Sequence, residues 1–254
     1  MVISSMNNYA SMQKLQMAMI KMSSGSKINS AADDAAGLSI SQKMLSQSNG
    51  YSQANENAAD AQNASNVAEG GLSGIEDSLQ RIRELSVKAG NGIYSDQDRA
   101  MMQKEIDQEK ASITDQVKGT EFNTIKMLDN NSDINLAINS KGNGMSMKMV
   151  DTSLETLGIA DYDVTKNFSI DAIDKAIAKV TSARNNFGTT SNILDKVIDS
   201  NDITNHNLMA SMSKITDTDY AKSSTDFSTQ SALNQYNYMA SQANIQQFSL
   251  LAKV

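Results

Sequence analysis

The sequence predicts a mainly α-helical protein: an elongated multi-helix bundle or coiled coil with paired terminal helices and a small central β-hairpin region. Three observations support this prediction: two apolar seams that repeat every seven residues, a central segment that alternates every second residue, and the absence of proline from all 254 residues. A seven-residue apolar repeat keeps one stripe of an α-helix facing a partner helix along its length. An interior proline would remove a backbone donor and clash with the preceding turn, so its absence favours long uninterrupted helices.

Each half of the chain carries one seam. The first seam consists of apolar residues spaced by seven, with others filling most positions four residues on: Ala54, Ala58, Ala61, Ala68, Leu72, Ile75, Leu79, Ile82 and Ala89. The second seam consists of Ile173, Val180, Phe187, Leu194, Leu208 and Ile215. Only Asn201 interrupts the second seam. Helices of this length must bury their stripes against each other or against other subunits, so the seams indicate assembly rather than chemistry in a pocket.

The N-terminal arm is expected to begin with a helix over residues 1 to about 28 that ends near Gly25. A connector of small residues follows, in which Asp33 and Asp34 suit the capping of the next helix because their carboxylates accept backbone donors and favour its positive end. The N-terminal helix and this connector together form the first predicted segment, residues 1–37.

Residues 38–128 are expected to hold the first bundle helices. The stripe is expected to start with Ile40, Met44 and Tyr51, and we interpret Gly70 and Gly71 as points of bending or close approach. A second helix opens at Ser95–Asp96, ends at Lys118–Gly119 and has an apolar stripe of its own: Met102, Ile106, Ile113 and Val117.

Residues 129–168 change period and predict a β-hairpin. Apolar residues alternate from Ile134 to Ile138 and again from Met145 to Met149, on either side of a glycine-rich turn. The C-terminal bundle helix is then expected over residues 169–216 and a final amphipathic helix within 217–254. The two terminal helices are poor in bulky apolar residues, so we expect them to be disordered in an isolated monomer and ordered only within an assembly.

Composition excludes several classes of function. The net charge of −7 disfavours nucleic acid as a partner, and no apolar stretch approaches the ~20 residues that span a bilayer. Residues 1–22 have neither an apolar signal core nor a small-residue cleavage site, so any export is expected to use no cleavable signal. With no cysteine and one histidine, His206, we expect no metal site, no cofactor and no enzyme activity.

Two carboxylate-rich segments have simpler interpretations than catalysis or metal binding. Adjacent Asp33 and Asp34 would point about 100° apart on a helix, so they do not form a catalytic pair. Residues 129–133 imitate the opening of a calcium loop, but Ile134 replaces the expected glycine and Ser140 the closing glutamate. We expect a cap and a turn at these positions, and a solvated or partner-facing position for His206.

Motifs at both ends of the chain resemble those of bacterial flagellin. The N-terminal motifs are KMSSGSKINSAADDAAGLSIS at residues 21–41, LQRIRELSV at 79–87 and TEFNT at 120–124. The C-terminal motifs are DTDYA at residues 217–221, SQAN at 241–244 and SLL at 249–251. They occur in the family's order and cover nearly the whole chain. Compared with the family, the segment before residue 23 is shorter by roughly two to three helical turns.

The resemblance implies a structural subunit that polymerises into the flagellar filament used for motility. It also implies secretion through the flagellar export apparatus, an export chaperone at the C-terminal helix, and junction and cap proteins at the filament ends. Two alternatives remain open: a hook–filament junction adaptor that caps rather than polymerises, and a secreted flagellin-like protein that acts mainly as an innate-immune ligand.

Four residues form a candidate recognition patch. Gln80, Arg81, Leu85 and Glu105 match positions that resemble the flagellin surface bound by the mammalian Toll-like receptor that senses flagellin. The simpler interpretation is a helix surface that contacts the next subunit. The two interpretations are compatible if the patch is buried between subunits in the filament and accessible to the receptor only on free monomers.

Overall fold

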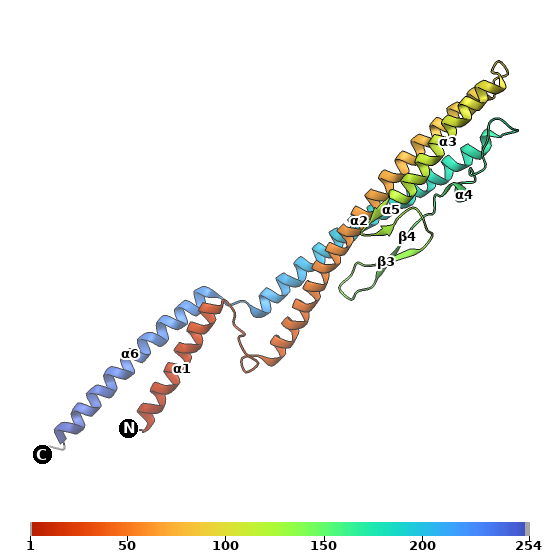
Figure 1. Cartoon of the computed structure of the whole chain (residues 1–254). Helices are drawn as coiled ribbons and strands as arrows, with labels where there is room; N and C mark the ends of the chain where they lie inside the picture. The colour runs from red at the N-terminus through yellow and green to blue at the C-terminus, as the bar shows by residue number, and fades with distance from the viewer. Residues whose placement is uncertain (1, 252–254) are drawn as a thin grey trace. The chain divides into compact units, whose positions relative to one another are not determined.

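The computed structural model describes residues 2–251, most of which form long helices (Figure 1). The helices are α1 (Val2–Ser24), α2 (Ala35–Ala89), α3 (Asp96–Gly119), α4 (Leu154–Leu157), α5 (Ile170–Thr216) and α6 (Tyr220–Leu251). The strands are β1 (Glu121–Phe122), β2 (Ile125–Lys126), β3 (Asp133–Ala137) and β4 (Gly144–Lys148). The mainly α-helical class with a central β-hairpin region is confirmed. Met1 and residues 252–254, which the sequence assigns to the terminal segments, lie outside the described residues.

The chain folds as two compact units. The terminal unit consists of Met1–Ser48 and His206–Val254, and the bundle unit of Asn49–Asn205. The terminal unit therefore contains α1, α6, the start of α2 and the end of α5, whereas the bundle unit contains the rest of those two helices with α3, α4 and the strands.

The bundle unit is built around the two seams. All nine residues of the first seam are buried, as are Ile173, Val180, Phe187 and Leu194 of the second. The stripe of α3 completes this core, and Ser95 caps that helix by exchanging hydrogen bonds with Asp98. The two C-terminal members of the second seam, Leu208 and Ile215, lie in the terminal unit and are only partly buried.

Ion pairs reinforce the contact between α2 and α5 at the edge of this core. Arg184 on α5 contacts Glu76 at 2.6 Å and Glu69 at 3.5 Å, and Arg83 on α2 contacts Asp174 at 2.7 Å. These side chains are partly exposed, so each pair adds little stability but fixes how the two helices align.

The β3–β4 hairpin packs against α2 and α5. Its strands pair antiparallel, with Ile134 opposite Met147 and Leu136 opposite Met145, so the alternating residues share one face, as predicted. At the turn, Gly142 adopts a φ of +78°, which glycine tolerates without strain.

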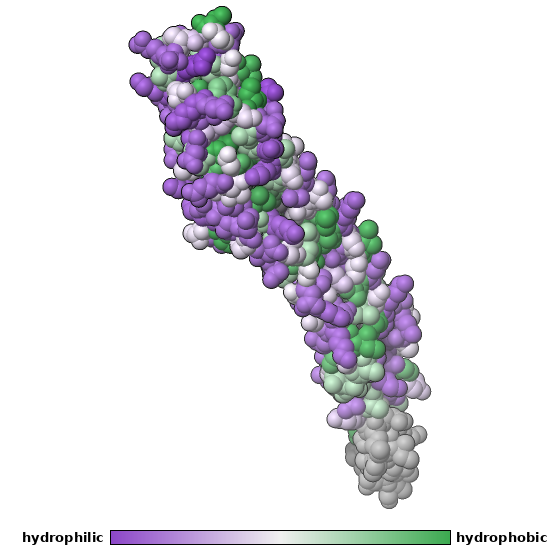
Figure 2. Space-filling view, turned by 90° about the vertical axis from the view of Figure 1, so that its right-hand side faces the viewer, coloured by the Kyte–Doolittle hydropathy of each residue, from purple (hydrophilic) through white to green (hydrophobic). Residues whose placement is uncertain are grey.

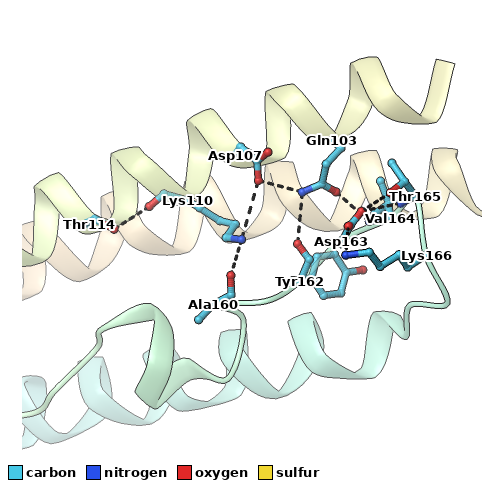
Figure 3. Close-up of polar contacts among 10 residues, drawn as sticks. All are labelled: Gln103, Asp107, Lys110, Thr114, Ala160, Tyr162, Asp163, Val164, Thr165 and Lys166. Carbon is cyan, nitrogen blue, oxygen red and sulfur yellow. Dashed lines mark hydrogen bonds and ion pairs between the residues drawn. The ribbon is translucent and has the colours of Figure 1, made fainter. Parts of the chain in front are cut away.

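Polar contacts from α3 hold the irregular segment that leads into α5 (Figure 3). The Gln103 side chain donates to the Tyr162 carbonyl at 3.3 Å and accepts from the Val164 amide at 2.8 Å. The Lys110 ammonium donates to the Ala160 carbonyl at 2.6 Å. Because these backbone groups have partners, the segment stays ordered without regular secondary structure.

Some local expectations need correction. Of the three residues predicted to start the α2 stripe, Met44 and Tyr51 are partly buried, on the same face as the buried Ser41 and Ser48. Ile40 is 47% exposed, so the prediction is wrong for this residue. Gly71 lies at a close approach, as expected, but a side chain at Gly70 would meet open space.

Two short elements were not predicted from the sequence. The β1–β2 hairpin has no glycine in its turn, and Asn123 and Thr124 adopt positive φ values there. The single turn of α4 could have been predicted, since Ser153 caps its start and Gly158 ends it in the left-handed conformation.

Candidate assembly surfaces

The paired terminal helices form the first candidate surface. Helices α1 and α6 lie side by side and run antiparallel (Figure 1). Backbone hydrogen bonds close the pair at one end, where the Lys27 amide donates to the Thr216 carbonyl at 2.7 Å and the Thr218 amide donates to the Gly25 carbonyl at 2.9 Å.

Very little apolar surface is buried within this pair. Among the side chains that the structure describes, no apolar residue of α1 or α6 is buried, and Ser11 is the one buried residue. The large apolar side chains that are exposed on these helices instead are Tyr9, Met12, Met17, Met19, Ile20, Tyr220, Leu233, Tyr236, Tyr238, Met239 and Ile245. We refer to this set as the terminal apolar surface. In Figure 2, hydrophobic residues reach the surface between hydrophilic ones.

Two hollows lie between α1 and α6. Met12 from α1 and Tyr238 and Met239 from α6 line a hollow of about 480 Å³. Another, of about 320 Å³, is lined by Met17 with Lys14 and Lys21 on one side and Asp226 on the other. The pair therefore offers apolar recesses with a few charged groups nearby, which suits the insertion of side chains from another helix.

The second candidate surface lies on the bundle unit, where α2 meets α3. The Arg81 guanidinium donates to Glu105 of α3, with a 2.8 Å bond from its Nε, and to Glu84 at 3.1 Å. These hydrogen bonds, first the one to Glu105, raise the pKa of Arg81, which stays charged. A hollow of about 420 Å³ beside them is also lined by Lys88 and Met101.

The predicted patch is brought together only in part. Arg81 and Glu105 contact each other, and Gln80 is exposed next to Arg81. Leu85 lines the same hollow as Arg81 and Glu105, but it is only 4% exposed and belongs to the hydrophobic core of the bundle unit, so it offers a partner little surface. Its position three residues after Ile82, a member of the first seam, could have indicated an inward side chain.

The other singled-out residues have local structural roles. The Asp34 carboxylate accepts from the Gly37 amide at 2.8 Å, which caps α2 as expected. Asp33 instead turns back to the connector and accepts from the amides of Asn29 and Ser30, and these bonds lower its pKa. His206 is exposed on α5.

The described part of the chain shows neither a cluster of metal-ligating side chains nor a helix that could span a membrane. There, no three histidine, cysteine or acidic side chains gather as they would around a metal ion. Over the same residues, no helix combines the length and apolarity that crossing a membrane requires.

Comparison with known proteins matches both arms of the chain. Residues 2–133 match the family model for the bacterial flagellin N-terminal helical region, and residues 170–252 match that for the bacterial flagellin C-terminal helical region. A flagellin of Halalkalibacterium halodurans is 37% identical over 245 residues, which cover 93% of this chain and 90% of that protein.

Further relatives agree. The flagellar filament 31.3 kDa core protein of Treponema maltophilum is 34% identical, covering 89% of this chain and 87% of its own length. The crystal structure of Bacillus cereus flagellin superimposes with a TM-score of 0.51 at 26% identity, over 57% of this chain and 88% of that one.

Proposed function

The chain belongs to the bacterial flagellin family and is a structural subunit of the extracellular flagellar filament, and we infer that its copies join mainly through the terminal apolar surface. The observation that supports this inference is the absence of buried apolar residues among the described side chains of α1 and α6. Two helices that bury so little against each other gain too little to stay ordered alone. Neighbouring subunits would supply the missing burial.

The energetic argument depends on summed contacts. Fully burying one large apolar side chain contributes about 1.5–3 kcal/mol. Several such side chains per subunit, buried against several neighbours at once, offset the loss of free motion on assembly. Head-to-tail contacts that do not close into a ring extend into a helical filament.

Seeded polymerisation tests this inference. Sonicated filament fragments are mixed with monomer, and elongation is followed by sedimentation and electron microscopy. Wild-type chain is expected to elongate the fragments without limit. Tyr236→Asp is expected to raise the critical concentration at least tenfold, because it places a charge in the buried face.

The matched control is Ser228→Asp, which adds the same charge to an exposed polar position of α6. It is expected to change the critical concentration less than threefold. If Tyr236→Asp elongates as readily as this control, the terminal apolar surface is not the main contact. If the wild-type chain adds once to each fragment and stops, the junction-adaptor alternative replaces the filament subunit.

Other partners follow from the same surface. We propose that an export chaperone covers α6 before secretion, since its apolar side chains would otherwise face water. Junction and cap proteins are proposed to bind at the filament ends, where subunits lack one neighbour. Export is proposed to proceed unfolded through the flagellar secretion apparatus, without a cleavable signal.

The Arg81–Glu105 patch is proposed to pack against the next subunit and, on free monomers, to be recognised by the mammalian Toll-like receptor that senses flagellin. Binding of monomer to the receptor ectodomain tests this, with Arg81→Ala expected to weaken binding. Arg83→Ala is the matched control, because it removes a comparably exposed ion pair from the same helix. Equal binding by wild type and Arg81→Ala, or none by either, excludes the patch as a recognition site.

A further inference from the structure

The methionines of this chain differ widely in their exposure to solvent. Those of the bundle core are enclosed: Met102, Met127, Met147 and Met149. Two on the terminal helices, Met12 of α1 and Met239 of α6, are 58% and 63% exposed and line the same hollow. Both thioethers are therefore exposed to water when no neighbouring subunit covers α1 and α6.

We propose that Met12 and Met239 are oxidation sites that control assembly: their sulfoxides form on free subunits and block polymerisation, whereas the filament protects them. The inference rests on the proposed role of the terminal apolar surface. It adds to that role a chemical modification, methionine oxidation, that can reach this surface only before assembly.

The chemistry needs a peroxide as oxidant. A sulfur lone pair attacks one peroxide oxygen, an S–O bond forms as the O–O bond breaks, and water leaves after proton transfer. Sulfur loses two electrons and the peroxide gains them. The product, methionine sulfoxide, replaces a flexible apolar group with a polar one that accepts strong hydrogen bonds.

The effect follows from where these groups lie. The surface that lines the hollow between Met12 and Met239 is mainly apolar, and Tyr238, Asn234 and Gln235 contribute to the lining. Once a neighbouring helix covers the hollow, a sulfoxide oxygen there would exchange its water for the few side-chain donors of the lining, and the apolar packing of the thioether would be lost. The same penalty would recur in every subunit.

Partial oxidation of the wild-type chain provides the main test. Monomer is treated with hydrogen peroxide until about half of the exposed methionines are modified, the peroxide is removed, and filament fragments are added as seeds. Polymer and supernatant are separated by sedimentation, and peptide mass spectrometry gives the sulfoxide fraction at each methionine. Met12 and Met239 sulfoxides are expected to be at least fivefold enriched in the supernatant.

Met209 serves as the internal control, since it is 50% exposed but lies on α5, outside the terminal apolar surface. Its sulfoxide is expected to distribute equally between the two fractions. Equal distribution of the Met12 and Met239 sulfoxides as well would overturn the proposal. Failure of the untreated chain to polymerise would instead overturn the proposed assembly function, so the two failures are distinguishable.

A variant pair gives an independent measurement. The double variant Met12→Leu/Met239→Leu removes both sulfurs, and Met209→Leu removes the control sulfur. For each, the critical concentration after peroxide treatment is divided by that of its own untreated sample. This ratio is expected to be at least tenfold for wild type and Met209→Leu, and at least threefold smaller for the double variant, in which the exposed Met17 and Met19 can still be oxidised. An undiminished ratio in the double variant would contradict the proposal.

Protection in the filament completes the test. Assembled filaments treated with the same peroxide are expected to accumulate Met12 and Met239 sulfoxides at least tenfold more slowly than monomers. Equal rates would show that assembly leaves both thioethers open to solvent. Methionine sulfoxide reductase, supplied with a thiol reductant, is expected to restore polymerisation of oxidised monomer.

Discussion

The side-chain amide of Asn201 donates a 3.0 Å hydrogen bond to the backbone carbonyl of Ile138, and both residues are buried. Asn201 is the single interruption of the second seam, and this hydrogen bond gives its polar side chain a structural role inside the core. It joins α5 to the end of strand β3, while Asn57 of α2 donates to the adjacent Ala137 carbonyl at 2.8 Å. The hairpin is thus held by both long helices.

Asn201→Ala is expected to destabilise the bundle unit by about 1–3 kcal/mol, because it leaves the buried Ile138 carbonyl without a donor. Chemical denaturation of the monomer followed by circular dichroism measures the change. Asp202→Ala, which removes an exposed hydrogen bond to Asn55, is the control and is expected to cost less than about 0.5 kcal/mol. Equal losses would show that the Asn201 bond has no special importance.

The first seam is tested by Ile82→Asp. Ile82 is fully buried on α2, so the substitution would place an unpaired charge in the core and is expected to abolish cooperative folding of the bundle unit. Val87→Asp adds the same charge at an exposed position of the same helix and is expected to keep the helical signal. Retained folding and polymerisation by Ile82→Asp would refute the role of the seam.

Acid sensitivity is expected at Asp163. Its carboxylate accepts from the Thr165 hydroxyl at 2.6 Å and the Thr165 amide at 2.9 Å, and contacts the Lys166 ammonium at 3.0 Å (Figure 3). These interactions, the Thr165 hydroxyl first, lower its pKa to about 2. Since the ordinary value in an unfolded chain is about 3.9, the ionised group stabilises the fold above that pH, and the contribution disappears as the pH falls to about 2.

Asp163→Asn is therefore expected to reduce stability at pH 7 and to have no effect below about pH 2. Solvent screening keeps the loss at neutral pH to about 0.5–1 kcal/mol. Denaturation curves of wild type and variant across this pH range measure the difference. A difference that does not change with pH would mean that the charge of Asp163 contributes nothing.

The seams and the hairpin were predictable because their periods differ so clearly. A stripe every seven residues specifies a helix, and an alternation every two residues specifies a strand, from the order of the residues alone. The failure at Ile40 has a physical cause: an apolar repeat indicates that a face will be covered, but not whether the same chain or another one covers it. The same limit applies to α1 and α6.

The candidate patch shows a different limit. Sequence similarity brought Arg81, Glu105 and Leu85 together, but whether a side chain points outward depends on its angle around the helix. Arg81 and Leu85 lie four residues apart on α2 and line the same hollow beside α3, but Leu85 also follows Ile82 by three residues and is buried, whereas Arg81 stays exposed. Likewise, the β1–β2 turn depends on positive φ values at Asn123 and Thr124. Because neither residue is a glycine, the sequence gives no sign of this turn.

The neighbouring glycines Gly70 and Gly71 on α2 are expected to respond to alanine with opposite signs. Nothing lies within 4 Å of a side chain built at Gly70, so Gly70→Ala is expected to stabilise the helix by about 0.5–1 kcal/mol. At Gly71, a methyl group would lie 2.9 Å from Cγ2 of Thr120 and 3.0 Å from Cδ1 of Leu128. Leu128 is fully buried, and the Thr120 hydroxyl is held by a 2.7 Å bond to the Gln116 carbonyl.

Neither neighbour of Gly71 can move without cost, so Gly71→Ala is expected to destabilise the bundle unit by about 1–3 kcal/mol despite the better helix propensity of alanine. Thermal denaturation of the two variants beside wild type measures the contrast. Because both substitutions add one methyl group to the same turn of α2, helix propensity alone would make them equal. Stabilisation by both would therefore show that α2 does not approach the residues after α3 as closely as described.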